Sequence, residues 1–146
     1  MIEYTDIQKT AIDMAKDFVK QKIEPIASSM DEQEKFPLEV VKEMGELGLL
    51  GIPYPEEYGG GGLDYVTYTA VIKEIAKACA STAMTVVAHS TLTVYPIFKF
   101  GSEKQKEQYL APLLSGKKIG AFALTEPNAG SDFASAESKA ILADGR

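Results

Sequence analysis

The order of apolar and polar positions predicts a chain built largely of amphipathic helices, because apolar residues recur at helical spacing through most of it. The first helix is expected to begin after Thr5. Thr5 and Gln8 have the spacing of a capping box, in which each side chain accepts the amide hydrogen of the other residue. Pro25 is expected to kink this helix. Its predicted apolar stripe comprises Ile7, Ala11, Met14, Ala15, Phe18, Val19 and Ile23.

Two further helices have recognisable ends. Pro37 lies in the first turn of one, where its missing N–H does no harm, and Gly48 is expected to stop it. A second capping box, Ser102 with Gln105, predicts a charged helix that stops near Gly116. The residues expected to be buried are Val40, Val41, Met44 and Leu47 in the first of these helices, and Tyr109, Leu113 and Leu114 in the second.

Between these helices lies a loop with two prolines and four consecutive glycines, residues 59–62. A phosphate-binding loop is a weak interpretation, because no Lys-Ser or Lys-Thr follows the glycines and no strand precedes them. The favoured interpretation is a flexible entry to the next helix, with Asp64 as its N-cap. Val71, Ile75 and Cys79 follow on one face of that helix, where Cys79 is expected to be an inert core residue.

The twenty-one residues from position 78 to 98 carry no formal charge, which is long enough to cross a bilayer. Seven of them are Ser, Thr or His, which are costly in hydrocarbon and acceptable in a protein interior. We therefore expect no membrane span but a buried helix that runs to about Phe100, capped by Ser81 or Thr82 and bent at Pro96. His89, the single histidine, has no other ligand at metal-binding spacing, so a solvated or hydrogen-bonded histidine is expected and no metal site.

The helical pattern ends after Lys118. Residues 119–124 form a short apolar run bounded by glycine and proline, which favours a strand. The last residues, 138–146, resemble a second strand that ends in a hairpin turn at Asp144-Gly145. Because a two-stranded piece is marginal alone, the rest of the sheet is expected outside these residues. The predicted fold is mainly α: a helical bundle followed by the first strands of a β-domain.

Composition and charge argue against several classes of function. A formal net charge of −6 without a basic stripe argues against a nucleic-acid partner. A chain with 45% hydrophobic and 25% charged residues is globular rather than disordered. One cysteine fits a reducing compartment, and the N-terminus lacks the apolar core of a secretory signal, so a cytoplasmic location is expected.

The segment LTEPNAGSD carries the candidate chemistry. A strand end presents backbone N–H and C=O groups in a fixed direction, and the Thr125 hydroxyl adds a donor and acceptor, which suits the edge of a flat heteroaromatic ring. Gly130 permits close backbone approach, and the amides near Gly130 and Ser131 can face an anion. Glu126 and Asp132 are moderate candidates for an acid or base, because loop carboxylates commonly tie turns together. From these residues alone, a phosphate-bearing planar cofactor and an ordinary turn both stay open.

Three stretches together resemble the acyl-CoA dehydrogenase family: GAFALTEPNAGSD, FGSEKQKEQYLAPLLSGKKIG and EEYGGGGLDYV. The likeness extends over nearly every segment in order and is nearest to the short-chain, butyryl-type members. It implies an N-terminal helical domain over residues 1–118 and the start of a middle β-domain over residues 119–146. Many relatives carry tyrosine where this chain has Phe122, which removes a hydroxyl and should leave backbone contacts intact.

The resemblance implies a flavoprotein that binds FAD and acyl-CoA. The residues implied to contact the flavin ring are Phe122, Ala123, Leu124 and Thr125. Those implied to contact the diphosphate are Gly130 and Ser131, and Ser131 also lies near the acyl-CoA. The uncharged helix would line the floor of the acyl cavity, where Met84, Ala88 and Leu92 share one face. A plain core stripe is the other interpretation of that face, and both can hold.

The reaction implied is α,β-dehydrogenation of an acyl-CoA thioester to a trans-2-enoyl-CoA, as in fatty acid β-oxidation, with electrons passing from FAD to electron-transferring flavoprotein. The catalytic carboxylate of the family belongs to a C-terminal helical domain, so no catalytic residue is assigned among these residues and Glu126 does not replace it. The chain alone is therefore expected to be inactive. A homotetramer is implied for the full-length enzyme.

Other activities use the same scaffold. Acyl-CoA oxidases and flavin monooxygenases differ in their reactivity with oxygen, so peroxide release distinguishes them from enzymes that reduce an artificial electron acceptor. A non-catalytic helical interaction module is a further alternative. The intact Thr125-Glu126-Pro127 and Gly130-Ser131-Asp132 argue against such a module.

Overall fold

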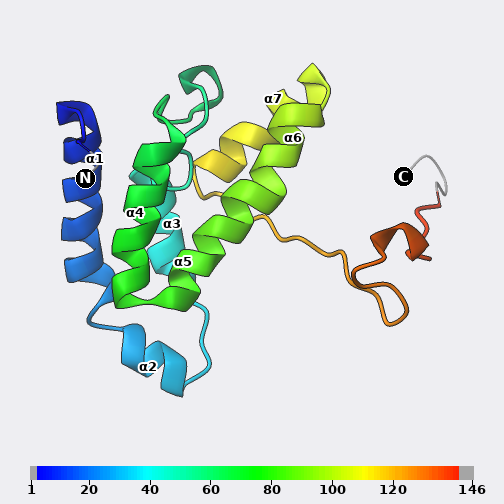
Figure 1. Cartoon of the computed structure of the whole chain (residues 1–146), viewed down its shortest axis with the longest axis horizontal. Helices are drawn as coiled ribbons and strands as arrows, with labels where there is room; N and C mark the ends of the chain where they lie inside the picture. The colour runs from blue at the N-terminus through cyan, green and yellow to red at the C-terminus, as the bar shows by residue number, and fades with distance from the viewer. Residues whose placement is uncertain (1–2, 142–146) are drawn as a thin grey trace.

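The computed structural model describes residues 3–141, most of which form a helical bundle, with a long arm that leads away from it toward the C-terminus (Figure 1). The prediction of a mainly α protein is confirmed. In chain order the elements are α1 (Asp6–Phe18), the π-helical turn η1 (Val19–Ile23), α2 (Ala27–Glu32), α3 (Leu38–Glu46), the 3₁₀ turn η2 (Glu56–Tyr58), α4 (Tyr65–Ala78), α5 (Ala80–Val87), the π-helical segment η3 (Ala88–Val94), α6 (Tyr95–Phe100), α7 (Glu103–Leu114) and the 3₁₀ turn η4 (Phe133–Ser135).

Helix α1 begins as the sequence predicts, and the predicted apolar stripe is buried only in its second half, at Ala15, Phe18, Val19 and Ile23. Both halves of the capping box form, and the Thr5 N–H donates to Oε1 of Gln8 at 2.9 Å. Ile7 and Met14 are exposed, because α1 lies at the side of the bundle and packs mainly against α4 (Figure 1). The buried side chains of α1 are Ile12, Ala15 and Phe18.

The first helix ends before Pro25 instead of continuing through a kink. The Glu24 N–H donates to the Val19 carbonyl, five residues back, at 2.9 Å, which closes the π-helical turn η1. A proline lacks an N–H and disfavours helix in the residue before it, so the helix stops here. The sequence pattern does not predict the short helix α2 that follows, because none of its residues is buried and it has no apolar stripe.

Helix α3 begins directly after Pro37, which is the N-cap and not in the first turn as predicted, and it stops before Gly48, as predicted. Gly48 has a φ of 75°, the left-handed conformation that glycine adopts easily after a helix. Val41 and Met44 are buried. Leu47, at the C-cap, is exposed, because it lies just beyond the turn that faces the core.

Helix α3 approaches the turn that follows α7 at two glycines. A Cβ atom added to Gly45 would lie 2.6 Å from the Cα of Gly116, which is closer than van der Waals contact allows. Gly116 has a φ of 72° and stops α7 where the sequence predicts. The close packing of α3 against this turn therefore depends on the absence of a side chain at Gly45.

The glycine-rich loop is held by its own backbone. The Gly62 N–H donates to the Tyr54 carbonyl at 2.8 Å, and the Leu63 N–H donates to the Ile52 carbonyl at 3.0 Å. Asp64 is confirmed as the N-cap of α4, since its carboxylate accepts a first-turn N–H at 2.8 Å. The loop is thus a paired structure rather than the flexible entry expected.

The uncharged stretch forms α5, η3 and α6 in one run that ends at Phe100, as predicted. Cys79, with an extended backbone, joins α4 to α5 and occupies the N-cap position that was expected for Ser81 or Thr82. Across residues 3–141, no helix has the length and apolar content needed to cross a membrane.

Helix α7 starts at the predicted capping box and buries one residue that the pattern does not single out. Leu110, Leu113 and Leu114 are buried, whereas Tyr109, predicted to be buried, is 38% exposed. Neighbouring residues on a helix point about 100° apart, so a shift of one position turns a side chain from the core toward solvent.

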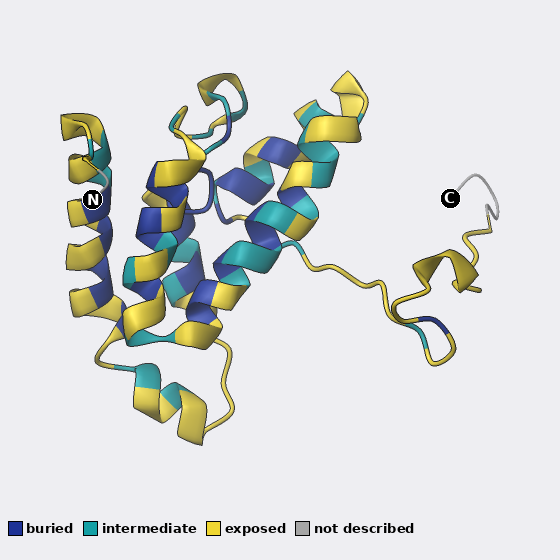
Figure 2. Cartoon of the chain, in the orientation of Figure 1, coloured by how far each residue is buried: buried dark blue, intermediate teal, exposed yellow. Residues whose placement is uncertain are grey.

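Figure 2 shows that the buried positions lie mainly on the helices of the bundle, whereas most of the arm is exposed. The buried hydrophobic residues form two clusters. The larger one joins α1, η1, α3, α4 and α5, and Ile119 at the start of the arm packs against it. The smaller one consists of Tyr54, Val94, Leu110, Leu113 and Leu114. The bundle therefore has its own core, to which the arm contributes at its first residues.

The predicted strand at residues 119–124 is extended but has no partner strand within residues 3–141. The single β-bridge in that range joins Glu126 to Ala129 inside a turn. An extended segment becomes a strand when a neighbouring strand supplies ladder hydrogen bonds, and the described residues contain no such strand. Residues 138–141 are irregular, and the predicted Asp144-Gly145 turn lies outside the described residues.

Candidate functional site

The helix predicted to form an acyl floor presents an open face. Met84 is 61% exposed, Leu92 is 43% exposed and Ala88, between them, is half-buried. They lie on one side of α5 and η3, while Val86 and Val94 point into the two core clusters. A plain core stripe is therefore excluded for Met84 and Leu92, and an apolar surface is available on this side of the helix.

A π-helical segment, η3, interrupts this helix just before Pro96. The Tyr95 N–H donates to the Ser90 carbonyl five residues back, and the Tyr54 hydroxyl donates to the same oxygen. The Ser90 hydroxyl donates to the Leu50 carbonyl at 2.9 Å. Segments of this kind occur often at functional sites, where they let side chains reach positions that a regular helix denies.

His89 is buried within η3 and is bonded at both ring nitrogens. The Gly120 N–H donates to Nδ1 at 3.0 Å, and Nε2 lies 3.1 Å from the carbonyl oxygen of Leu113. Because an N–H can only donate, Nδ1 is the acceptor, so the neutral ring carries its proton on Nε2 and donates it to Leu113. Burial lowers the pKa of His89, and the Leu113 carbonyl partly opposes this effect. The expectation of a hydrogen-bonded histidine is confirmed.

The segment predicted to hold the flavin ring has a free main chain. Within residues 3–141, no hydrogen bond involves a backbone N–H or C=O of residues 121–125. The side chains of Phe122 and Leu124 are 51% and 43% exposed, and Ala123 and Thr125 are also exposed. The row of polar backbone atoms is therefore available to a partner other than the bundle.

The loop after this segment is organised by Glu126. Its backbone exchanges two hydrogen bonds with Ala129, at 2.9 and 3.2 Å. Its carboxylate accepts the N–H of Glu137 at 2.7 Å and that of Ser138 at 3.0 Å. The Ser138 side chain, followed by the N–H groups of Glu137 and Ser138, holds the pKa of Glu126 below its usual value. Glu126 thus closes the loop, as loop carboxylates commonly do, and is not placed as a free base.

The residues predicted to meet the diphosphate lie at the exposed tip of this loop. Gly130 and Ser131 are exposed, and no atom would lie within 4 Å of a Cβ added to Gly130. The Ser135 hydroxyl donates to the carboxylate of Asp132, which turns the chain into η4. The backbone at Gly130 is thus open to a ligand from solvent.

The structure does not bring the two sets of predicted residues together. The arm carries Phe122 to Ser131 away from the bundle, while Met84, Ala88 and Leu92 stay on α5 and η3 (Figure 1). No site can form between them from the described residues alone.

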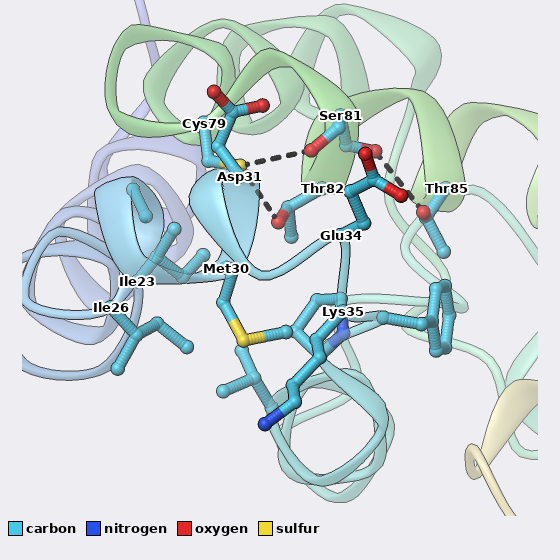
Figure 3. Close-up of a pocket in the computed structure, with 14 residues that line it drawn as sticks. Ile23, Ile26, Met30, Asp31, Glu34, Lys35, Cys79, Ser81, Thr82 and Thr85 are labelled. Carbon is cyan, nitrogen blue, oxygen red and sulfur yellow. Dashed lines mark hydrogen bonds between the residues drawn. The ribbon is translucent and has the colours of Figure 1, made fainter.

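Cys79, which packs against the larger core cluster, also lines a pocket (Figure 3). The pocket, of about 330 Å³, opens between α2 and the start of α5. The Thr82 hydroxyl donates to Sγ at 3.1 Å, and the Ser81 hydroxyl lies 3.2 Å from it. Burial raises the pKa of Cys79, but the hydrogen bonds from Ser81 and Thr82 outweigh it and the net shift is downward. The predicted core position is confirmed in part, because Cys79 packs against the larger core cluster but is only partly buried, and its predicted inertness stays a prediction.

A metal centre has no basis in the described part of the chain, where no cluster of three potential ligands occurs. The functional contact that sequence reasoning missed is the one between His89 and Gly120. The only hint of this contact in the sequence is a single histidine within an uncharged helix. Its partner, Gly120, lies thirty-one residues further along the chain, so no local pattern links the two.

Comparison with known proteins identifies the relatives of this chain. Residues 5–117 match the family described as "Acyl-CoA dehydrogenase, N-terminal domain". The probable acyl-CoA dehydrogenase YngJ of Bacillus subtilis is 48% identical over 139 residues, which make up 95% of this chain and 37% of that protein. The short-chain specific acyl-CoA dehydrogenase of Clostridium acetobutylicum is 43% identical over 92% of this chain and 36% of its own length. The chain thus spans about a third of the length of the curated relatives it matches.

Two solved structures have the same fold. A chain from the structure of the electron transferring flavoprotein of Acidaminococcus fermentans superposes with a TM-score of 0.93 at 38% identity, covering 99% of this chain and 38% of that one. An acyl-CoA dehydrogenase from Bacillus anthracis, solved in complex with FAD, superposes with a TM-score of 0.89 at 38% identity, covering 98% of this chain and 24% of that one.

Proposed function

This chain belongs to the acyl-CoA dehydrogenase family, and on that premise we propose that it supplies the flavin-binding segment and the acyl floor of a short-chain acyl-CoA dehydrogenase. The enzyme oxidises an acyl-CoA thioester to a trans-2-enoyl-CoA in fatty acid β-oxidation. Relatives that carry the short-chain name at 43% identity support the short-chain assignment.

The observation that carries the proposal is the free main chain of residues 121–125, next to a loop already closed by Glu126. A flavin ring has an edge of alternating donors and acceptors. Backbone groups with no partner in the described structure fit such an edge, and the Thr125 hydroxyl adds one more group. The amides near Gly130 and Ser131, at an open loop tip, fit an anionic diphosphate.

When bound, FAD accepts a hydride from the acyl chain. Residues 121–125 hold the ring by their backbone N–H and C=O groups, and Gly130 and Ser131 face the diphosphate. Met84, Ala88 and Leu92 cover the acyl chain and exclude water from it, which is the role that an exposed apolar helix face can fill. The task of this part of the enzyme is to orient the cofactor and the thioester.

No residue of this chain is proposed as the catalytic base. The Glu126 carboxylate accepts hydrogen bonds from the N–H groups of Glu137 and Ser138. Its pKa is lowered, which weakens it as a proton acceptor. The base is proposed to come from a C-terminal domain, so the 146-residue chain alone should show no turnover of butyryl-CoA. Turnover by the purified chain would contradict this assignment.

The remaining features of the enzyme are proposals on the same premise. The helical domain ends at residue 118 and a middle β-domain begins at 119. Electron-transferring flavoprotein accepts the electrons, the full-length enzyme is a homotetramer, and it works in the cytoplasm. Chromatographic mass determination tests the tetramer, and reduction of that flavoprotein by the enzyme tests the acceptor.

The deciding experiment is to purify the product of the complete gene. We expect a yellow protein with stoichiometric FAD, whose flavin absorbance is bleached by butyryl-CoA in the absence of oxygen. A colourless protein that gains no colour when FAD is added would instead favour a non-catalytic helical interaction module. Peroxide release in air would favour an acyl-CoA oxidase or a flavin monooxygenase.

A further inference from the structure

The arm is fixed to the bundle at three successive residues. The Lys118 N–H donates to the carbonyl of Pro112 in α7 at 2.8 Å, Ile119 packs against the larger core cluster, and the Gly120 N–H donates to Nδ1 of His89 at 3.0 Å. In the described range, the next five residues make no backbone hydrogen bond. Gly120 is therefore the last point at which the bundle controls the direction of the arm.

The backbone of Gly120 lies directly on η3. A Cβ atom added there would stand 2.3 Å from Cγ2 of Thr93 and 2.6 Å from its Cβ, so only glycine can occupy this position without displacing the chain. Gly120 thus packs against Thr93 of η3, and its N–H donates to the His89 ring of the same segment.

The ring of His89 cannot turn without loss. One nitrogen accepts from Gly120 and the other donates to Leu113 at the end of α7, and the side chain is fully buried. A flipped ring would exchange Nδ1 with Cδ2 and Nε2 with Cε1, so ring carbons would face the Gly120 N–H and the Leu113 carbonyl and both hydrogen bonds would be lost. His89 thus ties three elements together: η3, the end of α7 and the start of the arm.

We propose that His89 is a positioning residue that sets the direction in which the arm leaves the bundle, and so aligns residues 122–131 with the acyl floor. Ala88 precedes His89 on η3 and Leu92 follows it one turn later, so the helix that presents the floor also holds the arm. The clamp between His89 and Gly120 rests on geometry alone. Its effect on the flavin rests on the proposed function.

Two substitutions separate the two halves of the clamp. In His89→Asn the amide oxygen can take the place of Nδ1 and accept from Gly120, while the bond to Leu113 is lost. In His89→Gln the amide nitrogen can take the place of Nε2 and donate to Leu113, while Gly120 loses its acceptor. Each variant removes one buried hydrogen bond. A role that is merely structural therefore predicts equal effects, and a positioning role predicts unequal ones.

The first readout is hydrogen exchange of the Gly120 amide in the 146-residue chain, measured by NMR under conditions that favour folding. We expect exchange on the order of tenfold faster in His89→Gln and within about threefold of wild type in His89→Asn. Ser90→Ala is the matched control, because it removes a buried hydrogen bond to Leu50 from the same segment without touching the arm. It should leave the Gly120 amide within about threefold of wild type. Equal acceleration in both histidine variants, or none in either, overturns the clamp.

The second readout is the FAD dissociation constant of the complete gene product. We expect it to rise roughly fivefold to tenfold in His89→Gln and to stay within about twofold of wild type in His89→Asn and Ser90→Ala. An unchanged affinity in His89→Gln, with its Gly120 amide exposed, overturns the positioning role. If the wild-type product binds no FAD, the proposed function fails and the flavin part of this inference fails with it, while the exchange experiment still decides the clamp.

Discussion

At the scale of the residue, the polar side chains that matter most are those whose partners are backbone groups. His89 bonds to the backbone of Leu113 and Gly120, and Glu126 bonds to that of Glu137 and Ser138. Backbone partners stay in place when side chains vary, so each of these residues fixes a length of chain rather than a single contact.

The pKa of His89 predicts how stability depends on pH. Burial lowers this pKa from 6.5, against the smaller opposite effect of the Leu113 carbonyl. Below pH 6.5, His89 therefore binds a proton more readily in the unfolded chain than in the folded one. The contribution of neutral His89 to the free energy of unfolding is complete above pH 6.5 and is lost as the pH falls. Urea unfolding from about pH 7.5 to pH 5 should show this loss.

His89→Asn provides the reference for that measurement, because asparagine does not titrate. The stability advantage of the wild-type chain over His89→Asn should shrink as the pH falls. The carboxylates titrate alike in both chains and cancel in the difference. A difference that stays constant over this range would mean that His89 has the same pKa in the folded and the unfolded chain.

Glu126→Gln tests the closure of the loop. The glutamine side chain keeps one acceptor oxygen and loses the charge, so at least one of the amides of Glu137 and Ser138 should exchange roughly threefold to tenfold faster. The unfolding midpoint of the bundle should not move, because the loop lies on the arm. Glu137→Gln is the control, since the Glu137 N–H, not its side chain, makes the contact. Unchanged exchange in Glu126→Gln would show that the carboxylate does not hold the loop.

At the scale of the element, helix ends follow local rules and helix faces do not. Both capping boxes, the Asp64 cap and the glycine stops form where their residues stand in the sequence. The buried faces of α1 and α7 are each shifted from the predicted stripe, because a face is chosen by the neighbour that covers it. Local hydrogen bonds thus set where a helix lies in the chain, and packing sets how it is rotated.

The close approach of α3 to the turn after α7 predicts that a methyl group added at position 45 lowers the stability of the fold. In Gly45→Ala the new Cβ would stand 2.6 Å from backbone atoms of Ser115 and Gly116, which cannot move as a flexible side chain does. Helix α3 and the turn after α7 must separate, at a cost of about 1–3 kcal/mol in the free energy of unfolding. Urea denaturation measures it. Glu46→Ala, at the next and exposed position, should change little. An equal loss in both variants would contradict a steric cause.

At the scale of the whole molecule, the chain is a bundle with its own core and an arm that depends on it. The two core clusters belong to the bundle, and Ile119 is the arm residue that packs against them. Residues 121–125 have a free main chain, and the loop beyond them closes on itself through Glu126. The arm is therefore poised to pair with something outside the bundle, which accords with a chain that spans about a third of its relatives.

Removal of the arm tests this division. A chain that ends at Gly120 keeps the contacts of Lys118, Ile119 and Gly120, so its thermal midpoint should stay within about 2 °C of the full chain. A chain that ends at Lys117 loses those contacts and should unfold at a lower temperature. Circular dichroism at the helix band measures both. A large loss in the chain that ends at Gly120 would mean that the arm stabilises the bundle beyond Ile119.

The sequence alone determined the helical class, most helix ends and the family, because caps, glycine stops and motifs are local patterns. The sequence also predicts that residues 122–131 bind the cofactor, and this stays a prediction, because the groups that pair with the segment lie outside the described residues. The tertiary structure decided which side of each helix is buried, that Cys79 lines a pocket, and that His89 holds Gly120. These facts depend on residues that lie far apart in the chain, and periodicity carries no information about which distant group a side chain will meet.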